Sequence, residues 1–108
     1  MARRTTPTHK LLKFDGEIDL HCSPDVRREL NEAIAQKPAK LLIDLSSVPY
    51  VDSSGLAVLL EGMQGVEAYG GKLYVVAPHK DLRPIFETSK LDEVFRIVDS
   101  VDAAEAAA

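Results

Sequence analysis

The sequence predicts an α/β domain whose β-sheet is mainly parallel or mixed, with four to five strands and about four helices packed on it. Two observations support this fold class. The apolar runs at 41–45 and 72–77 are nearly continuous, as in strands that are covered on both faces. Segments with helical spacing of apolar residues lie between the strand-like runs and are long enough to connect one parallel strand to the next.

The first strand and the first helix have clear local signals. Residues 10–14 predict a strand or hairpin, which ends at a turn around Gly16. Ser23 and Pro24 are expected to open the helix, because serine is a favoured N-cap and proline suits the position after it. The helix ends before Pro38. Its apolar face consists of Val26, Leu30, Ala33 and Ile34.

A second helix is expected after the polar turn at 52–55 and before the glycines at 70–71. Its expected core residues are Leu56, Leu59, Leu60, Met63 and Val66. With these residues facing the core, Val58 would point outward, either as an ordinary surface residue or as part of a docking face. The remaining expected elements are a shorter helix at 81–89, made irregular by Pro84, a last strand at 94–98, and an alanine-rich helix at the C-terminus.

Composition excludes several classes of protein. The chain has 108 residues and a formal charge of -4, the wrong sign for a surface that follows nucleic-acid phosphates. Its single cysteine, Cys22, cannot form an internal disulfide, which favours a reducing compartment. The sequence contains neither a membrane-spanning apolar stretch nor a signal peptide, so a cytoplasmic protein is expected. We expect a flexible segment at 1–9 and a single domain at 10–108.

Side chains for catalysis or metal binding are not arranged in recognisable patterns. The three histidines lie far apart in sequence, and His21 beside Cys22 is better explained by packing than by zinc or thiol chemistry. Asp19, Asp44 and Asp52 form a conceivable carboxylate cluster, but no paired nucleophile or oxyanion donor accompanies them. We therefore expect no enzyme activity, no catalytic residues, no metal site and no cofactor.

The informative motif is Asp52-Ser53-Ser54-Gly55, a polar turn between a buried strand and an apolar helix. One interpretation is structural: Asp52 or Ser53 caps the helix, and Gly55 lets the backbone turn tightly. The other is regulatory, because a serine at an exposed helix start is accessible to a kinase. A phosphate there would add about -1.5 to -2 charges beside Asp52.

Four motifs in this order resemble the STAS domain family. They are Phe-Asp-Gly-Glu-Ile-Asp at 14–19, Leu-Ile-Asp-Leu at 42–45, Asp-Ser-Ser-Gly-Leu at 52–56 and Gly-Gly-Lys-Leu at 70–73. The resemblance covers about residues 10–98, nearly the whole chain. Within the family, the chain is most similar to the bacterial anti-sigma factor antagonists.

The resemblance implies a non-catalytic partner-switching protein. Such an antagonist binds an anti-sigma factor that is also a serine kinase. It is released when the kinase phosphorylates the first serine of the motif, and a serine phosphatase restores it. That serine matches Ser53, the aspartate before it matches Asp52, and an early aspartate of the family that lies near the same surface matches Asp19. ATP and magnesium belong to the kinase. The expected partner-binding residues are Asp19, Asp52, Ser53, Ser54, Gly55 and Val58.

The resemblance leaves an alternative open. Some STAS proteins are the small subunit of a bacterial phospholipid-transport ABC system, where the partner is the transporter permease, and others are signalling adaptors. Neither alternative implies nucleic-acid binding or direct insertion into a membrane. The motif therefore predicts the fold more specifically than it predicts the partner.

Overall fold

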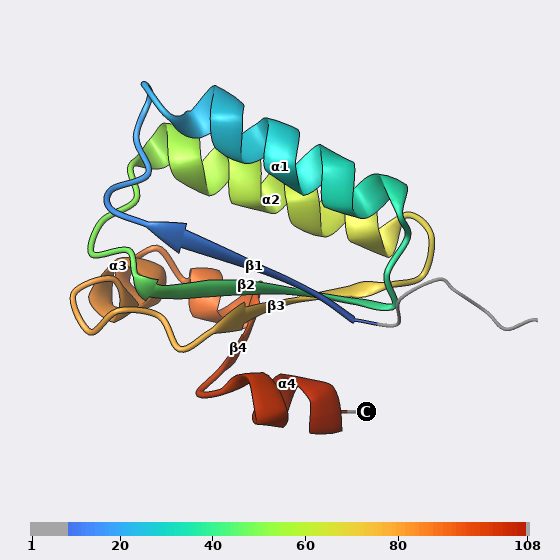
Figure 1. The fold of residues 1–108 in the computed structure, drawn as a ribbon. Helices are drawn as coiled ribbons and strands as arrows, with labels where there is room; N and C mark the ends of the chain where they lie inside the picture. Colours follow the sequence, from blue (N-terminus) through green and yellow to red (C-terminus); the bar gives the residue numbers. More distant parts are fainter. Residues whose placement is uncertain (1–8, 108) are drawn as a thin grey trace, which may run out of the picture.

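The structure is a computed structural model that describes residues 9–107. Its described part contains a four-stranded parallel sheet in the order β1-β2-β3-β4, which confirms the expected α/β class (Figure 1). The strands are β1 His9–Asp15, β2 Lys40–Ser47, β3 Lys72–Val76 and β4 Arg96–Val98. The helices are α1 Ser23–Ala35, α2 Ser53–Glu67, α3 Arg83–Thr88 and α4 Val101–Ala106, with a 3₁₀ helix at Leu91–Glu93.

The sheet separates two apolar clusters. Alternate residues of β2 point to opposite faces, so that Leu41 and Ile43 face α1 and α2 whereas Leu42 faces α4. Leu82 and Phe86, at α3, belong to the larger cluster on the α1 and α2 side. Figure 1 shows α1 and α2 on one side of the sheet and α4 on the other. The main core is the larger cluster, which lies between the sheet and the helices α1 and α2.

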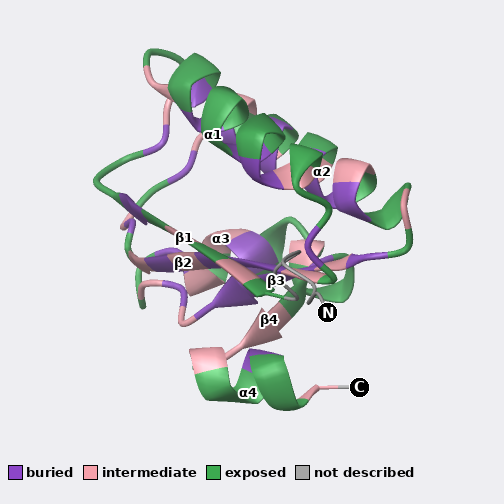
Figure 2. Cartoon of the chain, turned by 45° about the vertical axis from the view of Figure 1, so that its right-hand side comes forward, coloured by how far each residue is buried: buried purple, intermediate pink, exposed green. Residues whose placement is uncertain are grey.

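Glycines allow α1 and α2 to pack closely. A Cβ on Gly62 would lie 3.2 Å from Cδ1 of Leu30, and one on Gly65 would lie 3.2 Å from Cδ1 of Ile34. The buried residues of α2 are Gly55, Val58, Leu59, Gly62, Met63 and Val66, which follow a helical spacing. Figure 2 shows that α1 exposes its outer side to solvent.

The expectation that Val58 points outward is wrong, because its exposed fraction is 1%. The buried face of α2 begins at Gly55 and includes Gly62, whereas the sequence analysis began it at Leu56. Leu59, Met63 and Val66 are buried as expected, but glycines contribute nothing to an apolar pattern, so the predicted face was centred too far toward Leu56 and Leu60. Leu56 and Leu60 are half-buried at its margin.

Both proline-containing helix starts differ slightly from expectation. Cys22, not Ser23, is the N-cap of α1, and the Ser23 hydroxyl instead donates to the carbonyl of Leu20 at 3.4 Å. Pro84 lies in the first turn of α3, where a proline needs no backbone N–H, and so it fits the helix.

A short C-terminal helix covers part of the second face of the sheet. Ala104 of α4 is buried with Leu42, Tyr74 and Val76. The Nζ of Lys40 donates to the carbonyls at the end of α4, those of Ala104, Glu105 and Ala107, at 3.0, 2.9 and 2.6 Å. This one lysine on β2 therefore holds the C-terminus of α4 to the sheet.

The expected flexible segment at 1–9 lies outside the described residues except for His9, which begins β1. Over residues 9–107, no helix combines the length and the apolar character needed to cross a membrane. The same residues contain no group of three or more histidine, cysteine or acidic side chains that could hold a metal ion.

Candidate functional site

The candidate site lies where β1 and β2 lead into α1 and α2, at one end of the sheet (Figure 1). Beyond the strand ends, Ile18 and Val51 form an isolated parallel bridge. The Ile18 N–H donates to the carbonyl of Tyr50 at 3.0 Å, and the Asp52 N–H donates to the carbonyl of Ile18 at 3.1 Å. Both bridge side chains are buried. The bridge thus joins the loop that carries Asp19 to the loop that carries Asp52.

Asp52 is bonded through both carboxylate oxygens. Its Oδ1 accepts a hydrogen bond from the Gly55 N–H at 3.0 Å, which makes Asp52 the N-cap of α2. Its Oδ2 accepts from the Leu20 N–H at 3.2 Å. The capping interpretation is therefore confirmed for Asp52 and not for Ser53. The same side chain also ties the β1–α1 loop to the start of α2.

Asp19 organises the turn that precedes α1. Its Oδ1 accepts hydrogen bonds from the N–H groups of His21 and Cys22 at 3.0 and 3.3 Å. Desolvation by itself would raise the pKa of the Asp19 carboxyl. The bonds from Cys22 and His21, together with the positive potential of His21, outweigh that effect and hold the pKa below its usual value. Asp19 is therefore stabilised as a carboxylate.

Cys22 has a structural role in the same turn. Its Sγ accepts from the Asp19 N–H at 3.2 Å and lies 3.3 Å from the Glu17 carbonyl oxygen. The side chain also packs against the main core. Cys22 therefore packs within this turn, as expected.

The two serines of the motif differ in accessibility. Ser53 is the first residue of α2 and is exposed, whereas Ser54 is half-buried. Within residues 9–107, the Ser53 hydroxyl has no hydrogen-bond partner. The structure therefore exposes Ser53 at the start of α2, next in the chain to the aspartate that caps this helix.

Gly55 is needed for a different reason from the one expected. It lies within α2 and does not have a positive φ, so it does not make a tight turn. A Cβ at this position would lie 2.6 Å from Cγ1 of Val51 and 2.8 Å from both Cγ2 and the carbonyl oxygen of Ile18. Gly55 is buried, and its lack of a side chain lets the first turn of α2 pack directly against the Ile18–Val51 bridge.

Val58 was expected at this surface, but two other apolar residues lie there instead. Val58 is buried in the core and offers no side chain to a partner. Leu20 and Tyr50, in contrast, are 66% and 46% exposed. Their positions, directly after Asp19 and two residues before Asp52, were the signal that could have identified them.

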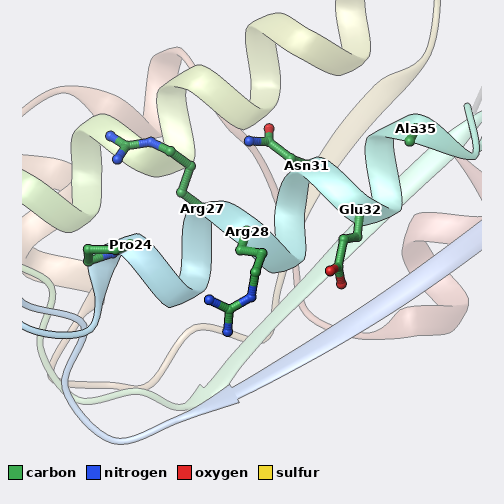
Figure 3. A pocket seen from close by; sticks show the side chains of 6 residues that line it. All are labelled: Pro24, Arg27, Arg28, Asn31, Glu32 and Ala35. Carbon is green, nitrogen blue, oxygen red and sulfur yellow. The ribbon is translucent and has the colours of Figure 1, made fainter.

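A separate hollow lies on the outer side of α1 (Figure 3). It is shallow, has a volume of about 490 Å³, and is lined by Pro24, Arg27, Arg28, Asn31, Glu32 and Ala35. Arg27 is paired with Glu61 of α2 at 3.0 Å, and Arg28 with Asp25 at 3.1 Å. None of the expected site residues lines this hollow.

Comparisons with known proteins agree with the fold. The model of the STAS domain family matches residues 1–104. The anti-sigma-F factor antagonist RsfB of Mycobacterium tuberculosis is 31% identical over 94 residues, which cover 87% of this chain and 76% of RsfB.

Two solved structures have the same fold. An anti-sigma factor antagonist from Mycobacterium paratuberculosis matches with a TM-score of 0.80 and 27% identity, over 94% of this chain and 86% of that one. The Bacillus protein SpoIIAA in its phosphorylated form matches with a TM-score of 0.68 and 23% identity, over 95% of this chain and 94% of that one. Because the family model spans nearly the whole sequence, this chain belongs to the STAS domain family.

Proposed function

We propose that this chain is an anti-sigma factor antagonist that binds an anti-sigma factor through the surface around Ser53. The anti-sigma factor is also a serine kinase, and phosphorylation of Ser53 releases the antagonist. The observation that carries the proposal is the exposed Ser53 at the start of α2, whose hydroxyl has no hydrogen-bond partner among residues 9–107 and whose backbone is fixed by the Asp52 cap and the Ile18–Val51 bridge.

The accessibility of the two serines favours Ser53 as the phosphate acceptor. A kinase must bring the γ-phosphate of ATP to the attacking oxygen, which requires space on the outer side of that oxygen. Ser53 provides this space, whereas Ser54 is half-buried. ATP and magnesium are bound by the kinase, and this chain supplies only the hydroxyl. A serine phosphatase then returns the antagonist to its binding state.

Electrostatics explains why the phosphate would act on binding. Ser53 follows Asp52, and the bridge brings the Asp19 loop to the same end of the sheet. A phosphate adds about -1.5 to -2 charges at this acidic position and would lose hydration in an interface. A tenfold loss of affinity requires only about 1.4 kcal/mol. Release therefore needs no refolding of the antagonist.

The relatives support this role. RsfB is named an anti-sigma-F factor antagonist. SpoIIAA, which shares the fold, has been solved both unphosphorylated, as an anti-sigma factor antagonist, and phosphorylated. The same fold therefore exists with a phosphate attached in at least one protein.

The test uses the purified anti-sigma factors encoded in the genome of the source organism, each mixed with this chain, ATP and Mg²⁺. One of them is expected to bind the unmodified chain and to phosphorylate it at Ser53, as mapped by peptide mass spectrometry. Ser53→Ala should bind without being released, and Ser53→Asp should bind more weakly. Ser54→Ala is the matched control and should still be phosphorylated.

Two results would contradict the proposal. One is a phosphate that maps to Ser54 or persists in Ser53→Ala. The other is affinity purification from the native cell that recovers a transporter permease and its ATPase, with or without ATP, and no kinase-like protein. The second result would favour a transport subunit.

A further inference from the structure

We propose that Leu20 and Tyr50 are apolar anchors. They insert into an apolar pocket, free of acidic residues, on the anti-sigma factor that phosphorylates Ser53. This assignment rests on the proposed function and adds the residues that supply binding affinity. The acidic and hydroxyl groups of the motif would then make binding depend on phosphorylation, while the two anchors supply most of the affinity.

Exposure together with position at the candidate site distinguishes these two residues. Large apolar side chains that are strongly exposed within residues 9–107 are Leu11, Leu20, Tyr50 and Val94. Leu20 is the most exposed of them, at 66%. Leu20 and Tyr50 come from separate loops, and both loops meet at the candidate site. A single exposed apolar residue is ordinary, but two at the same polar site form a surface suited to a partner.

The backbone beneath both anchors is already ordered. The Leu20 N–H is bonded to Oδ2 of Asp52, and the Tyr50 carbonyl accepts from the Ile18 N–H. The Ile18–Val51 bridge lies between these two bonds. A partner therefore does not have to order these loops on binding, and less of the binding energy is lost as conformational entropy.

Charge argues for a protein partner rather than a membrane or a nucleic acid. The loops that carry the anchors contain Glu17, Asp19 and Asp52, against one weakly basic residue, His21. Anionic lipid headgroups and nucleic-acid phosphates would be repelled by these carboxylates. An apolar pocket on a protein surface without acidic residues accommodates both the anchors and the acids.

The anchors also account for the effect of phosphorylation. Ser53 begins α2 directly after the loop that carries Tyr50, and it follows Asp52, whose side chain binds the Leu20 backbone. A partner that covers both anchors excludes water from their surroundings. A phosphate on Ser53 would then be partly dehydrated, which is unfavourable for a doubly charged group.

The experiment measures, by isothermal titration calorimetry, the affinity of the anti-sigma factor that binds the wild-type chain. Leu20→Ser and Tyr50→Ser are each expected to raise Kd at least tenfold, as for residues that dominate an interface. Leu11→Ser and Val94→Ser remove comparably exposed apolar side chains outside the site and should change Kd less than threefold. Leu20→Met and Tyr50→Phe keep an apolar side chain and should keep most of the affinity.

Thermal melts of all variants check that each one folds, since all four positions are strongly exposed. Folded Leu20→Ser and Tyr50→Ser proteins that bind like the wild type would overturn the anchor assignment and leave the proposed function intact. Equal losses in the four serine variants would also overturn it. If the wild-type chain binds no anti-sigma factor, the proposed function fails, and the anchors fail with it.

Discussion

The Asp52 carboxylate accepts a hydrogen bond from the backbone N–H of Leu20, which lies 32 positions earlier in the sequence. Because its other oxygen caps α2, this one side chain connects the end of one loop to the start of a helix. The geometry of the candidate site therefore depends on a residue that also contributes to stability. Binding and folding effects must be separated by the choice of substitution.

Substitutions of Asp52 measure its contribution to folding. Asp52→Ala removes both acceptors and is expected to reduce the free energy of unfolding by about 1 kcal/mol. Asp52→Asn keeps the capping oxygen and should remain close to wild-type stability, because asparagine is an equally good N-cap. Urea unfolding followed by circular dichroism measures both. Asp25→Ala, at the start of α1, is the control and should change stability by less than about 0.5 kcal/mol. Equal losses in all three variants would contradict the capping role.

Gly55 gives a prediction opposite to ordinary helix propensity. Alanine stabilises an exposed helix by about 1 kcal/mol relative to glycine. At Gly55, however, the added Cβ would lie 2.8 Å from the carbonyl oxygen of Ile18, a backbone atom that cannot rotate away. Gly55→Ala is therefore expected to destabilise the protein by about 1–3 kcal/mol.

The matched control is Gly65→Ala on the same helix. Among the described residues, the only close neighbour of its Cβ would be Cδ1 of Ile34, at 3.2 Å, which is the flexible end of a side chain. The free energy of unfolding of this variant should therefore be equal to that of the wild type or higher. Chemical unfolding of the two variants side by side tests the comparison. If Gly55→Ala is more stable than the wild type, the Ile18–Val51 bridge can move to make room for a Cβ. The close contact with Ile18 would then not require glycine at this position.

The sequence predicted those features that arise from local periodicity. The apolar run at 41–45 identified β2 because both faces of that strand are covered, and the polar turn at 52–55 placed the start of α2. Leu59, Met63 and Val66 are buried as predicted, but Gly55 and Gly62 lie on the same face without any apolar signal, so the predicted face was centred too far toward Leu56 and Leu60.

The site could be predicted only in part, for a physical reason. Asp52 as a helix cap is a local feature and was one of two capping candidates. The Ile18–Val51 bridge and the bond from Leu20 to Asp52 join residues more than 30 positions apart, and no periodic pattern encodes such contacts. The exposure of Leu20 and Tyr50 depends on how the two loops meet, so it became visible only in three dimensions.

Lys40 is expected to control the order of α4. Its Nζ donates to three carbonyls at the helix end and lies 5.7 Å from the centre of the Tyr74 ring. Lys40→Met keeps the apolar stem but loses these bonds, so we expect a loss of about 1–2 kcal/mol. Hydrogen exchange should accelerate at the Ala104 N–H, which bonds to Ser100. Lys80→Met, at an exposed position, should change neither measurement. Unchanged exchange in Lys40→Met would rule out this role.

Asp19 makes stability dependent on pH in acid. Its pKa is lower in the folded protein than in the unfolded chain, so the unfolded chain takes up the proton first as the pH falls. The stabilisation is present above the ordinary aspartate pKa of about 3.9 and is lost as the pH falls through the folded-state value. Asp19→Asn should therefore be less stable than the wild type at pH 7, and the difference should shrink toward pH 3. Urea midpoints at both values test the trend. An NMR titration of the Asp19 carboxyl with a midpoint above about 3.9 would refute it.

Phosphorylation of Ser53 is expected to leave the fold intact. A phosphate at the N-terminus of the 15-residue helix α2 is favourable by about 0.3–1 kcal/mol. Repulsion from Asp52 opposes it by a similar amount, so the two effects nearly cancel. In a domain of this size, about 1 kcal/mol shifts the melting temperature by roughly 4–8 °C, which sets the largest expected difference. Thermal melts of the phosphorylated and unmodified proteins, with kinase-treated Ser53→Ala as control, measure the shift. A phosphorylated protein that unfolds at ambient temperature would show that the switch acts through folding rather than through the binding surface.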